Sequence, residues 1–481
     1  MMAVVPPESF WVQVFRSKVA KDLLEENHGA LCSTIDKSST NNASLNLLKL
    51  AIQEGASIDA IEYLVQEILP VEALLERDAS GKTALHHACV ATATTTSTNA
   101  VSSFELVQML VQRAPSSVLV RCFLEDEDDQ NDTNGVLPSM LAHCSSGAST
   151  RTVRYLLDIQ LKLQQALILT HSDLAYLGWH QATYLERLIA VAWENTHCLR
   201  EVSLLECRLS YCSWKLLQDI VAAVPGGRLQ KLCIRHLHIW QAQVVGRQEQ
   251  RQRFQMDVRI WQEIIEKHQS SLQILELPGF YALTSSTIYA ITNYLTMRRL
   301  PHLKTLNFQS INYACQFSDE AMTNLAEVVN SRHCHLQSLS LGNLTAHAFH
   351  LLLKSLRFNT SIQSLAIGNV NILGVDNLKD MRRCVLKMLD DNSTLGYFRG
   401  PHALARCPRV DFYLTLNREY RRKDMGHWSA SLVSEILAKA ATATSRPTRS
   451  KDADETSDSS VVFYILQSRP DILNHHTVMQ Q

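Results

Sequence analysis

One apolar spacing recurs along residues 199–370 and limits the folds open to this chain more than any other feature. Apolar residues occupy the first, fourth and sixth positions of each copy, and a cysteine or a further apolar residue occupies the ninth. The six copies are Leu199-Val202-Leu204-Cys207, Leu229-Leu232-Ile234-Leu237, Leu272-Leu275-Leu277-Phe280, Leu303-Leu306-Phe308-Ile311, Leu336-Leu339-Leu341-Leu344 and Ile362-Leu365-Ile367-Val370, and Leu395 with Phe398 begins a truncated seventh. Their first residues are 30, 43, 31, 33, 26 and 33 positions apart, which indicates one repeated structural unit.

A helical pattern follows most copies, at residues 214–224, 258–268, 320–330, 348–358 and 378–389. A strand and a helix within about 30 residues resemble the repeat of ribonuclease-inhibitor-like leucine-rich-repeat proteins. The resemblance implies a curved α/β solenoid with a parallel sheet on its inner face, which we place at residues 199–400. The chain departs from that family at the ninth position, where only Cys207 offers a side chain able to hydrogen-bond the turn.

A second internal similarity lies within residues 45–170. Residues 44–51, 81–88 and 135–142 can be aligned, and each segment ends on an alanine that is followed by a second amphipathic helical pattern. The sequence GKTALHHA at residues 81–88 resembles the G-x-T-P-L-H-x-A signature of ankyrin repeats, with Ala84 in place of proline. The resemblance implies a degenerate array of paired helices.

These two patterns predict tandem repeat solenoids, an N-terminal α-helical ankyrin-like array followed by an α/β leucine-rich-repeat horseshoe with a helical C-terminal cap. Residues 1–44 are predicted to be an N-terminal helix and a polar linker, and residues 171–198 a helical connector. The cap is predicted at residues 401–481, with a disordered loop at 441–460, because a repeat array needs its open end covered.

Charge and cysteine content limit the class of partner and the cellular environment that the sequence predicts. The 481 residues include 46 Lys and Arg against 47 Asp and Glu, a formal net charge of -1 that argues against a generally basic nucleic-acid binder. The twelve cysteines are scattered without a CxxC pair, as expected for reduced thiols. With no secretory signal and no apolar run long enough to span a bilayer, we expect a soluble cytoplasmic or nuclear protein with no membrane contact. The sequons that begin at Asn343, Asn359 and Asn392 are then not expected to be glycosylated.

The search for chemistry finds no catalytic motif. Gly81-Lys82-Thr83 contains the last residues of a phosphate-binding loop, but the glycine that this loop requires earlier is Glu76 here. His86 and His87 lie near Cys89, and residues 332–335 include two histidines and a cysteine, yet neither group has a second pair at a metal-binding distance. We therefore predict no enzyme activity, no cofactor and no metal site.

The inner face of the predicted sheet is the candidate binding surface. Side chains alternate across a strand, so the polar residues between the apolar positions should project from the sheet on one side. An ordinary solvated surface is one interpretation, and a groove for another protein is the other, with Arg235, His236 and Glu276 as anchors. The candidate partner-binding residues are Arg200, Glu206, Lys231, Arg235, His236, Glu276, Lys304, Asn307, Asn343 and Asn369.

The function predicted from the sequence is a non-catalytic scaffold or adaptor that binds a protein through this face or through the ankyrin loops. That step is an analogy at the level of the fold. A substrate receptor of a ubiquitin ligase and an enzyme without a recognisable motif are the alternatives. The polar insert at 241–253 and the acidic segment at 125–135 are further candidates for partner contact, each weighed against a solvated loop.

Overall fold

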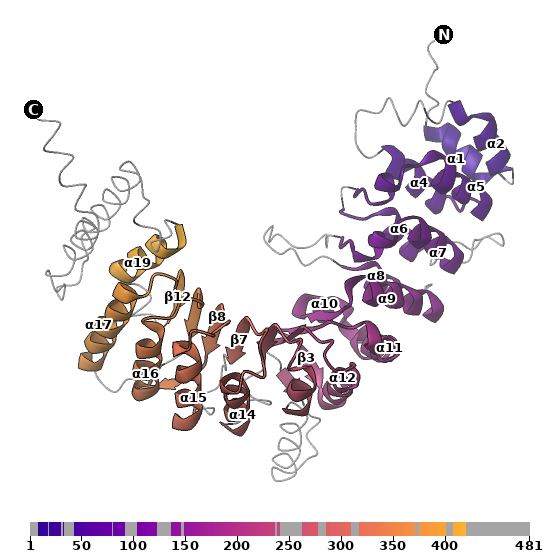
Figure 1. Cartoon of the computed structure of the whole chain (residues 1–481). Coiled ribbons are helices and arrows are strands. Elements are labelled where there is room, and N and C mark those ends of the chain that lie inside the picture. The colour runs from indigo at the N-terminus through magenta and orange to yellow at the C-terminus, as the bar shows by residue number, and fades with distance from the viewer. Residues whose placement is uncertain are drawn as a thin grey trace, which may run out of the picture. The chain divides into compact units, whose positions relative to one another are not determined.

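The computed structural model describes residues 8–17, 19–29, 32, 43–78, 80–91, 103–122, 136–145, 149–235, 238–240, 262–277, 285–308, 317–368, 370–371, 375–400 and 407–419 (Figure 1). The chain divides into two compact units. The first comprises Met1–Pro225 and Leu237–Ala242, and the second comprises Gly226–His236 and Gln243–Gln481. The predicted loops at 125–135, 241–253 and 441–460 lie outside the described residues.

The first unit begins with helices and continues into strands. Its helices are α1 (Glu8–Arg16), α2 (Ala20–Glu26), α4 (Ala43–Gln53), α5 (Ile58–Tyr63), α6 (Ala84–Ala91), α7 (Ser103–Arg113), α8 (Pro138–Cys144), α9 (Thr150–Gln164), α10 (His171–Leu177), α11 (Gln181–Glu194) and α12 (Tyr211–Ala223). Its strands are β1 (Ala166–Thr170), β2 (Glu201–Leu205), β3 (Arg208–Ser210) and β5 (His238–Trp240). β1 pairs with β2 and β3 with β5, in both cases parallel.

Small residues explain how the helices of the first unit pack. Ala51 in α4, Ala88 in α6 and Ala142 in α8 are fully buried, and the absence of a larger side chain lets neighbouring helices approach closely. α6 packs against α4, α7 and α8, so the three aligned segments form one row of helices. These helices lie where the internal similarity of the sequence predicted them.

The second unit alternates strands with helices. Its strands are β4 (Lys231–Arg235), β6 (Ile274–Glu276), β7 (Thr305–Phe308), β8 (Ser338–Leu341), β9 (Leu344–Thr345), β10 (Ser364–Ile367), β11 (Val370–Asn371) and β12 (Tyr397–Arg399). Its helices are α14 (Ser285–Thr296), α15 (Asp319–Asn330), α16 (Ala346–Leu356), α17 (Val375–Asp391) and α19 (Pro408–Glu419), and residues 262–268 are also helical. α19 packs against α17 and β12 at the end of the unit.

The sheet topology corrects the predicted fold class. Eight parallel strands follow chain order, β1-β2-β4-β6-β7-β8-β10-β12, and alternate with helices. The first of them lies at Ala166–Thr170, inside the range predicted as ankyrin repeats and ahead of residue 199, where the horseshoe was expected to begin. The prediction of an ankyrin array followed by a leucine-rich-repeat horseshoe is therefore wrong, and the fold is an α/β fold built on a parallel sheet.

The incorrect prediction has a physical cause. Apolar residues at the first, fourth and sixth positions describe a turn followed by a strand that buries one face under helices, and any parallel α/β arrangement needs such strands. The segments that end on alanine likewise indicate only that helices pack closely, which occurs in many helical folds. Neither pattern is specific to one repeat family.

Burial alternates along the strands of the second unit. In β7, Leu306 and Phe308 are buried while Thr305 and Asn307 are half-buried, and β8 and β10 repeat this order. Figure 1 shows α14, α15, α16 and α17 along one side of these strands. The apolar side chains therefore face the helices, and the polar side chains lie on the opposite side, which we call the open face.

Buried asparagines close the turns that lead from helices into strands. The Asn392 amide nitrogen donates to the carbonyls of Leu356 (2.6 Å) and Asn359 (3.1 Å), and its oxygen accepts from the backbone of Thr394 (2.9 Å) and Leu395 (2.8 Å). The Asn359 amide nitrogen likewise donates to the Val329 carbonyl, and its oxygen accepts the backbone N–H groups of Ser361 and Ile362. Both amides are buried and hydrogen-bonded through nitrogen and oxygen, so neither of these two sequons offers an accessible acceptor for a glycan in this fold.

A histidine lies in the turn before β6, four residues before Leu272. His268 is buried, and its Nδ1 accepts the backbone N–H of Leu229 at 3.4 Å, which requires the neutral ring. Burial lowers the pKa of His268 to about 4 from its usual 6.5, and the nearby Lys267 acts in the same direction.

This pKa predicts acid sensitivity. Because the folded pKa lies below the unfolded one, the contribution of His268 to stability is complete above about pH 6.5 and is lost as the pH falls toward 4. A shift of this size corresponds to about 3 kcal/mol. We expect urea unfolding of His268→Asn, which retains an acceptor but cannot be protonated here, to lose that much less stability between pH 7 and pH 4 than the wild type. Equal losses in the two proteins would contradict this assignment.

None of the helices within the described ranges is long and apolar enough to cross a membrane.

Candidate functional site

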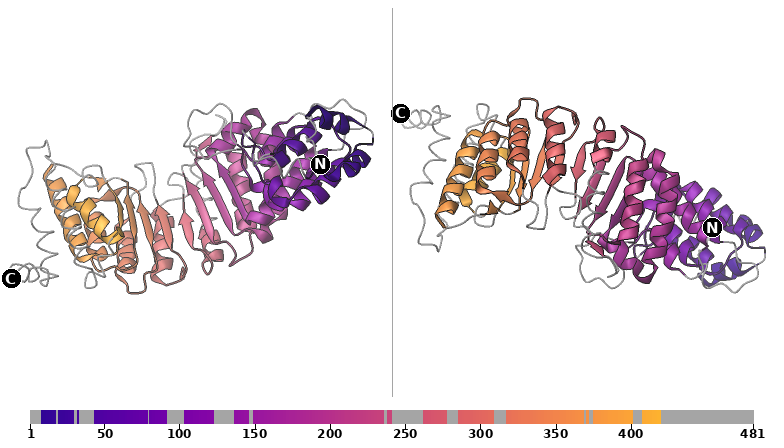
Figure 2. Two further views of the ribbon diagram at one scale, coloured as in Figure 1. Left: turned by 90° about the horizontal axis from the view of Figure 1, so that it is seen from above. Right: turned by 90° about the horizontal axis from the view of Figure 1, so that it is seen from below.

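The open face of the second unit consists of two rows of side chains that cross the sheet in register. The strands that carry them lie side by side in chain order (Figure 2). The first row is Lys231, Ile274, Thr305, Ser338, Ser364 and Tyr397, and the second is Cys233, Glu276, Asn307, Ser340, Ala366 and Arg399. Most of the central members are small and polar, so they leave the sheet backbone close to the surface.

An ion pair occupies the β4 end of the open face. The Arg235 guanidinium donates through Nε and through Nη2 to the two oxygens of Glu276, the second bond measuring 2.6 Å. The Cys233 thiol donates to Glu276 Oε2 at 2.6 Å. The Glu276 side chain is 5% exposed whereas that of Arg235 is 52% exposed. The buried carboxylate therefore fixes a cation that is presented to solvent.

Electrostatics at this end follow from burial and from the ion pair. Burial by itself would raise the pKa of Glu276, but the hydrogen bonds from Arg235 and Cys233 outweigh it and lower that pKa. Burial and then the adjacent carboxylate raise the pKa of Cys233 to about 12, so this thiol stays protonated at neutral pH. The bond to Glu276 also raises the pKa of Arg235. At neutral pH the cluster therefore holds a carboxylate, a guanidinium and a neutral thiol.

An aromatic and cationic group occupies the other end, on β12. Tyr397 is 57% exposed, and the Arg418 guanidinium of α19 lies over its ring at 5.0 Å from the ring centroid. Arg399, two residues after Tyr397, is exposed on the same face. Gly396 allows this approach, since a Cβ atom there would lie 3.2 Å from the Arg418 Cβ. The sequence analysis did not predict these residues because the seventh copy is truncated and only the six complete copies supplied candidates, although Leu395 and Phe398 already marked the strand.

The predicted partner-binding residues belong to both units. Lys231, Arg235, Glu276 and Asn307 come together on the open face of the second unit. Arg200 and Glu206 belong to the first unit, where both are exposed and Glu206 has a left-handed backbone with φ of 58°. Lys304 is exposed just before β7, and Asn343 is half-buried between β8 and β9. His236 and Asn369 lie outside the described residues.

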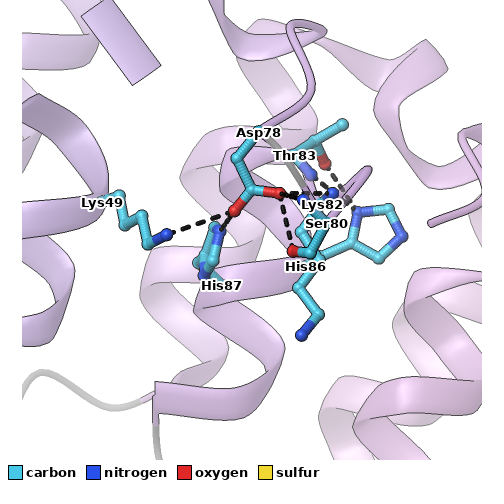
Figure 3. A network of polar contacts seen from close by, with 7 residues as sticks. All are labelled: Lys49, Asp78, Ser80, Lys82, Thr83, His86 and His87. Carbon is cyan, nitrogen blue, oxygen red and sulfur yellow. Dashed lines mark hydrogen bonds and ion pairs between the residues drawn. The ribbon is translucent and has the colours of Figure 1, made fainter. Parts of the chain in front are cut away.

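A second polar cluster surrounds Asp78 in the first unit (Figure 3). One oxygen of Asp78 accepts from the Ser80 backbone N–H (2.9 Å) and hydroxyl (2.7 Å) and from the Lys82 backbone N–H (2.9 Å). The other lies 3.2 Å from Lys49 Nζ and 2.8 Å from His87 Nε2. Burial would raise the Asp78 pKa, but these bonds hold it well below its usual range. The carboxylate thus fixes the turn before α6.

This geometry shows that the Gly81-Lys82-Thr83 sequence belongs to a turn closed by Asp78 and not to a phosphate-binding loop. The backbone N–H groups that a phosphate would need at Ser80 and Lys82 are bound to Asp78, so this turn does not form a phosphate cradle. His86 is buried, with Nδ1 at 2.8 Å from the Thr83 hydroxyl and Nε2 at 3.3 Å from the Val136 carbonyl oxygen. Burial lowers its pKa to about 4. Its ring therefore joins α6 to the segment before α8.

Metal-ligating side chains do not converge in the part of the chain that the structure describes, where no group of three or more His, Cys, Asp or Glu side chains could hold an ion. His333 and His335 are exposed in the turn before β8, while Cys334 between them is buried.

No protein-family model matches the chain, and no curated protein is significantly similar to it. The assignment to the ankyrin and leucine-rich-repeat families rested on short motifs and is contradicted by the order of the parallel sheet described above.

Proposed function

We propose that the second unit is a non-catalytic module that binds another protein on its open face. The observation that carries this proposal is a parallel sheet whose helices cover one face while the other presents half-buried small polar side chains. Parallel sheets are usually buried on both faces. A partner that covers the open face would complete the burial that the chain itself provides on one side only.

The rigidity of the face also supports binding. Arg235 is held by two hydrogen bonds to a buried carboxylate, so little side-chain entropy remains to be lost when a partner contacts it. Arginine and tyrosine are enriched among residues that dominate binding energies, and both occur here, at Arg235 and Tyr397. The small residues between them can approach a partner backbone closely.

The thiol chemistry favours a non-catalytic role. Cysteine nucleophiles act as thiolates and have lowered pKa values. Cys233 on the open face has the opposite shift, since burial and Glu276 raise its pKa to about 12.

Blocking the open face tests the proposal. Ser340 lies in the middle of the second row, and its replacement by arginine would place a long side chain over the sheet. We expect Ser340→Arg to reduce the recovery of proteins captured from native lysate by about tenfold, a loss of about 1.4 kcal/mol. Glu327→Arg is the matched control, because Glu327 is exposed on α15.

Both variants are first compared with the wild type by circular dichroism and thermal unfolding. With folding intact, identical captured proteins for wild type and Ser340→Arg would overturn the proposed function, as would an equal loss with Glu327→Arg.

A further inference from the structure

A thiol, an imidazole and a phenol come together among the first helices of the first unit. His28 Nδ1 lies 2.8 Å from the Tyr63 hydroxyl oxygen, and His28 Nε2 lies 3.5 Å from Cys32 Sγ. The rings of His28 and Tyr63 meet edge to face, with 6.2 Å between their centroids. The imidazole therefore joins Cys32 to Tyr63, and we call these three residues the thiol cluster.

Packing of the helices positions the thiol cluster. Tyr63 is the last residue of α5, and His28 lies two residues after the end of α2. α2 packs against α5, and Leu24 of α2 and Ala60 of α5 are both fully buried. His28 and Cys32 both have helical backbone and are four residues apart, a spacing that places two side chains on the same face of a helical turn. The buried core of these helices therefore holds Tyr63 beside the turn that carries the imidazole.

The thiol cluster can be reached from solvent. Cys32 is half-buried, and His28 is exposed. A Cβ atom added at Gly29 would meet no other atom within 4 Å, so there is open space beside the turn that carries His28. Among the cysteines that the structure describes, Cys32 alone has its sulfur within hydrogen-bonding distance of a histidine nitrogen. This sulfur is therefore accessible to a small dissolved molecule and lies next to a base.

We infer that Cys32 is a modification site, a thiol that hydroperoxides oxidise to a sulfenic acid with His28 as the general base. The thiolate is the form of cysteine that attacks, and transfer of the thiol proton to His28 Nε2 produces it. The resulting imidazolium has an N–H on each ring nitrogen, and the thiolate and the Tyr63 oxygen can each accept one of them. The site belongs to the first unit, so it is independent of the function proposed for the open face.

Tyr63 is a positioning residue in this scheme. Burial, and then the nearby Glu25, Cys32 and Glu67, raise the pKa of Tyr63 above its usual value. The phenol therefore keeps its proton at neutral pH, and its oxygen remains a neutral acceptor for the N–H at His28 Nδ1. That bond holds the ring with Nε2 directed at the sulfur.

The oxidation balances within the thiol cluster. The Cys32 sulfur bonds to one peroxide oxygen as the O–O bond breaks, and the leaving oxygen takes the proton that His28 Nε2 removed from the thiol. With hydrogen peroxide the products are a sulfenic acid and water, so the sulfur is oxidised and the peroxide is reduced. A sulfenic acid condenses with a free thiol to a disulfide, which makes this modification reversible.

Trapping with dimedone, which reacts with sulfenic acids, tests the inference on the purified full chain. The reduced protein is treated with hydrogen peroxide at neutral pH, and peptide mass spectrometry measures the rate of dimedone labelling at each cysteine. Cys384 on α17 is the internal control, because it is also half-buried and no described histidine nitrogen lies within hydrogen-bonding distance of its sulfur. We expect Cys32 to be labelled at least about tenfold faster than Cys384.

Variants separate base catalysis from a structural role. We expect His28→Ala to slow the labelling of Cys32 at least about tenfold, and added imidazole to restore part of the rate because a free base then replaces the side chain. Tyr63→Phe keeps the ring but removes the oxygen that orients His28, and should slow labelling about threefold. His333→Ala, at an exposed histidine of the second unit, should leave the rate unchanged. Circular dichroism and thermal unfolding first establish that each variant is folded.

Three results would overturn the inference. The first is equal labelling of Cys32 and Cys384, and the second is a wild-type rate in folded His28→Ala. The third is a slow rate in His28→Ala that imidazole does not restore, because His28 would then act only through the local structure. None of these results depends on whether the open face captures a protein.

Discussion

Replacing Arg235 with alanine is expected to destabilise the second unit by about 4 kcal/mol at neutral pH. The Arg235 side chain is half exposed, but its partner Glu276 is 5% exposed, so the variant leaves a buried carboxylate whose remaining donor is the Cys233 thiol. Without the guanidinium, burial would raise the pKa of Glu276. Chemical denaturation monitored by circular dichroism measures the loss.

The pH dependence of this variant follows from the sign of the shift. A carboxyl group whose folded pKa lies above its unfolded value favours folding when protonated, and this advantage is lost as the pH rises. Arg235→Ala should therefore be closer to the wild type at pH 5 than at pH 8. Arg399→Ala removes an exposed arginine from the same face and is expected to change stability by less than about 0.5 kcal/mol. Similar effects of the two substitutions would contradict the role assigned to Glu276.

Replacing Asn392 with alanine is expected to cost about 4 kcal/mol, again in the second unit. The substitution removes four hydrogen bonds and leaves two backbone N–H groups and two carbonyl oxygens without this partner in a buried turn. Each typical hydrogen bond contributes about 1 kcal/mol, and unsatisfied buried groups add to the loss.

Asn330→Ala is the matched control for that turn, because Asn330 is exposed at the end of α15. We expect a change of less than about 0.5 kcal/mol for this variant. Asn392→Asp should also be destabilised, since a carboxylate oxygen would replace the amide that donates to Leu356 and Asn359. A wild-type midpoint for Asn392→Ala would show that the turn does not depend on its amide.

The sequence predicted the strands of the second unit well, for a physical reason. Leu306 and Phe308 in β7, and their counterparts in β8 and β10, must be buried on the helix side, and that requirement is visible as a fixed spacing. The sequence did not predict β1 because its first position is not apolar, unlike that of the other copies. Gln164 stands where the other copies have their first leucine, as the pairing of Ala166 with Glu201 shows.

The family resemblance was misleading because the spacing of apolar residues indicates which side chains are buried and does not identify a protein family. The family pattern places hydrogen-bonding residues at the ninth position of each copy, where this chain has one only at Cys207. The side chains that satisfy the second unit's turns instead come three residues before the first apolar position, at Asn359 before Ile362 and Asn392 before Leu395. Their role depends on backbone groups that only the folded turn brings together.

The ion pair of the open face was predicted only in part. Both Arg235 and Glu276 were expected on one face, but their contact depends on the register that pairs Cys233 with Glu276. Forty-one residues separate Arg235 from Glu276 in the chain, and apolar spacing does not encode the register across such an interval. The cationic β12 end was missed because the repeat pattern stops within that strand.

Site-specific photocross-linking tests most directly the central claim that a protein binds the open face. A photoreactive amino acid is introduced in place of Ser340 in one protein and in place of Glu327 on α15 in another, and both are irradiated in native lysate. The account predicts that position 340 yields a discrete cross-linked protein that is absent at position 327. Cross-links at position 327 alone, or the same protein at both positions, would contradict it.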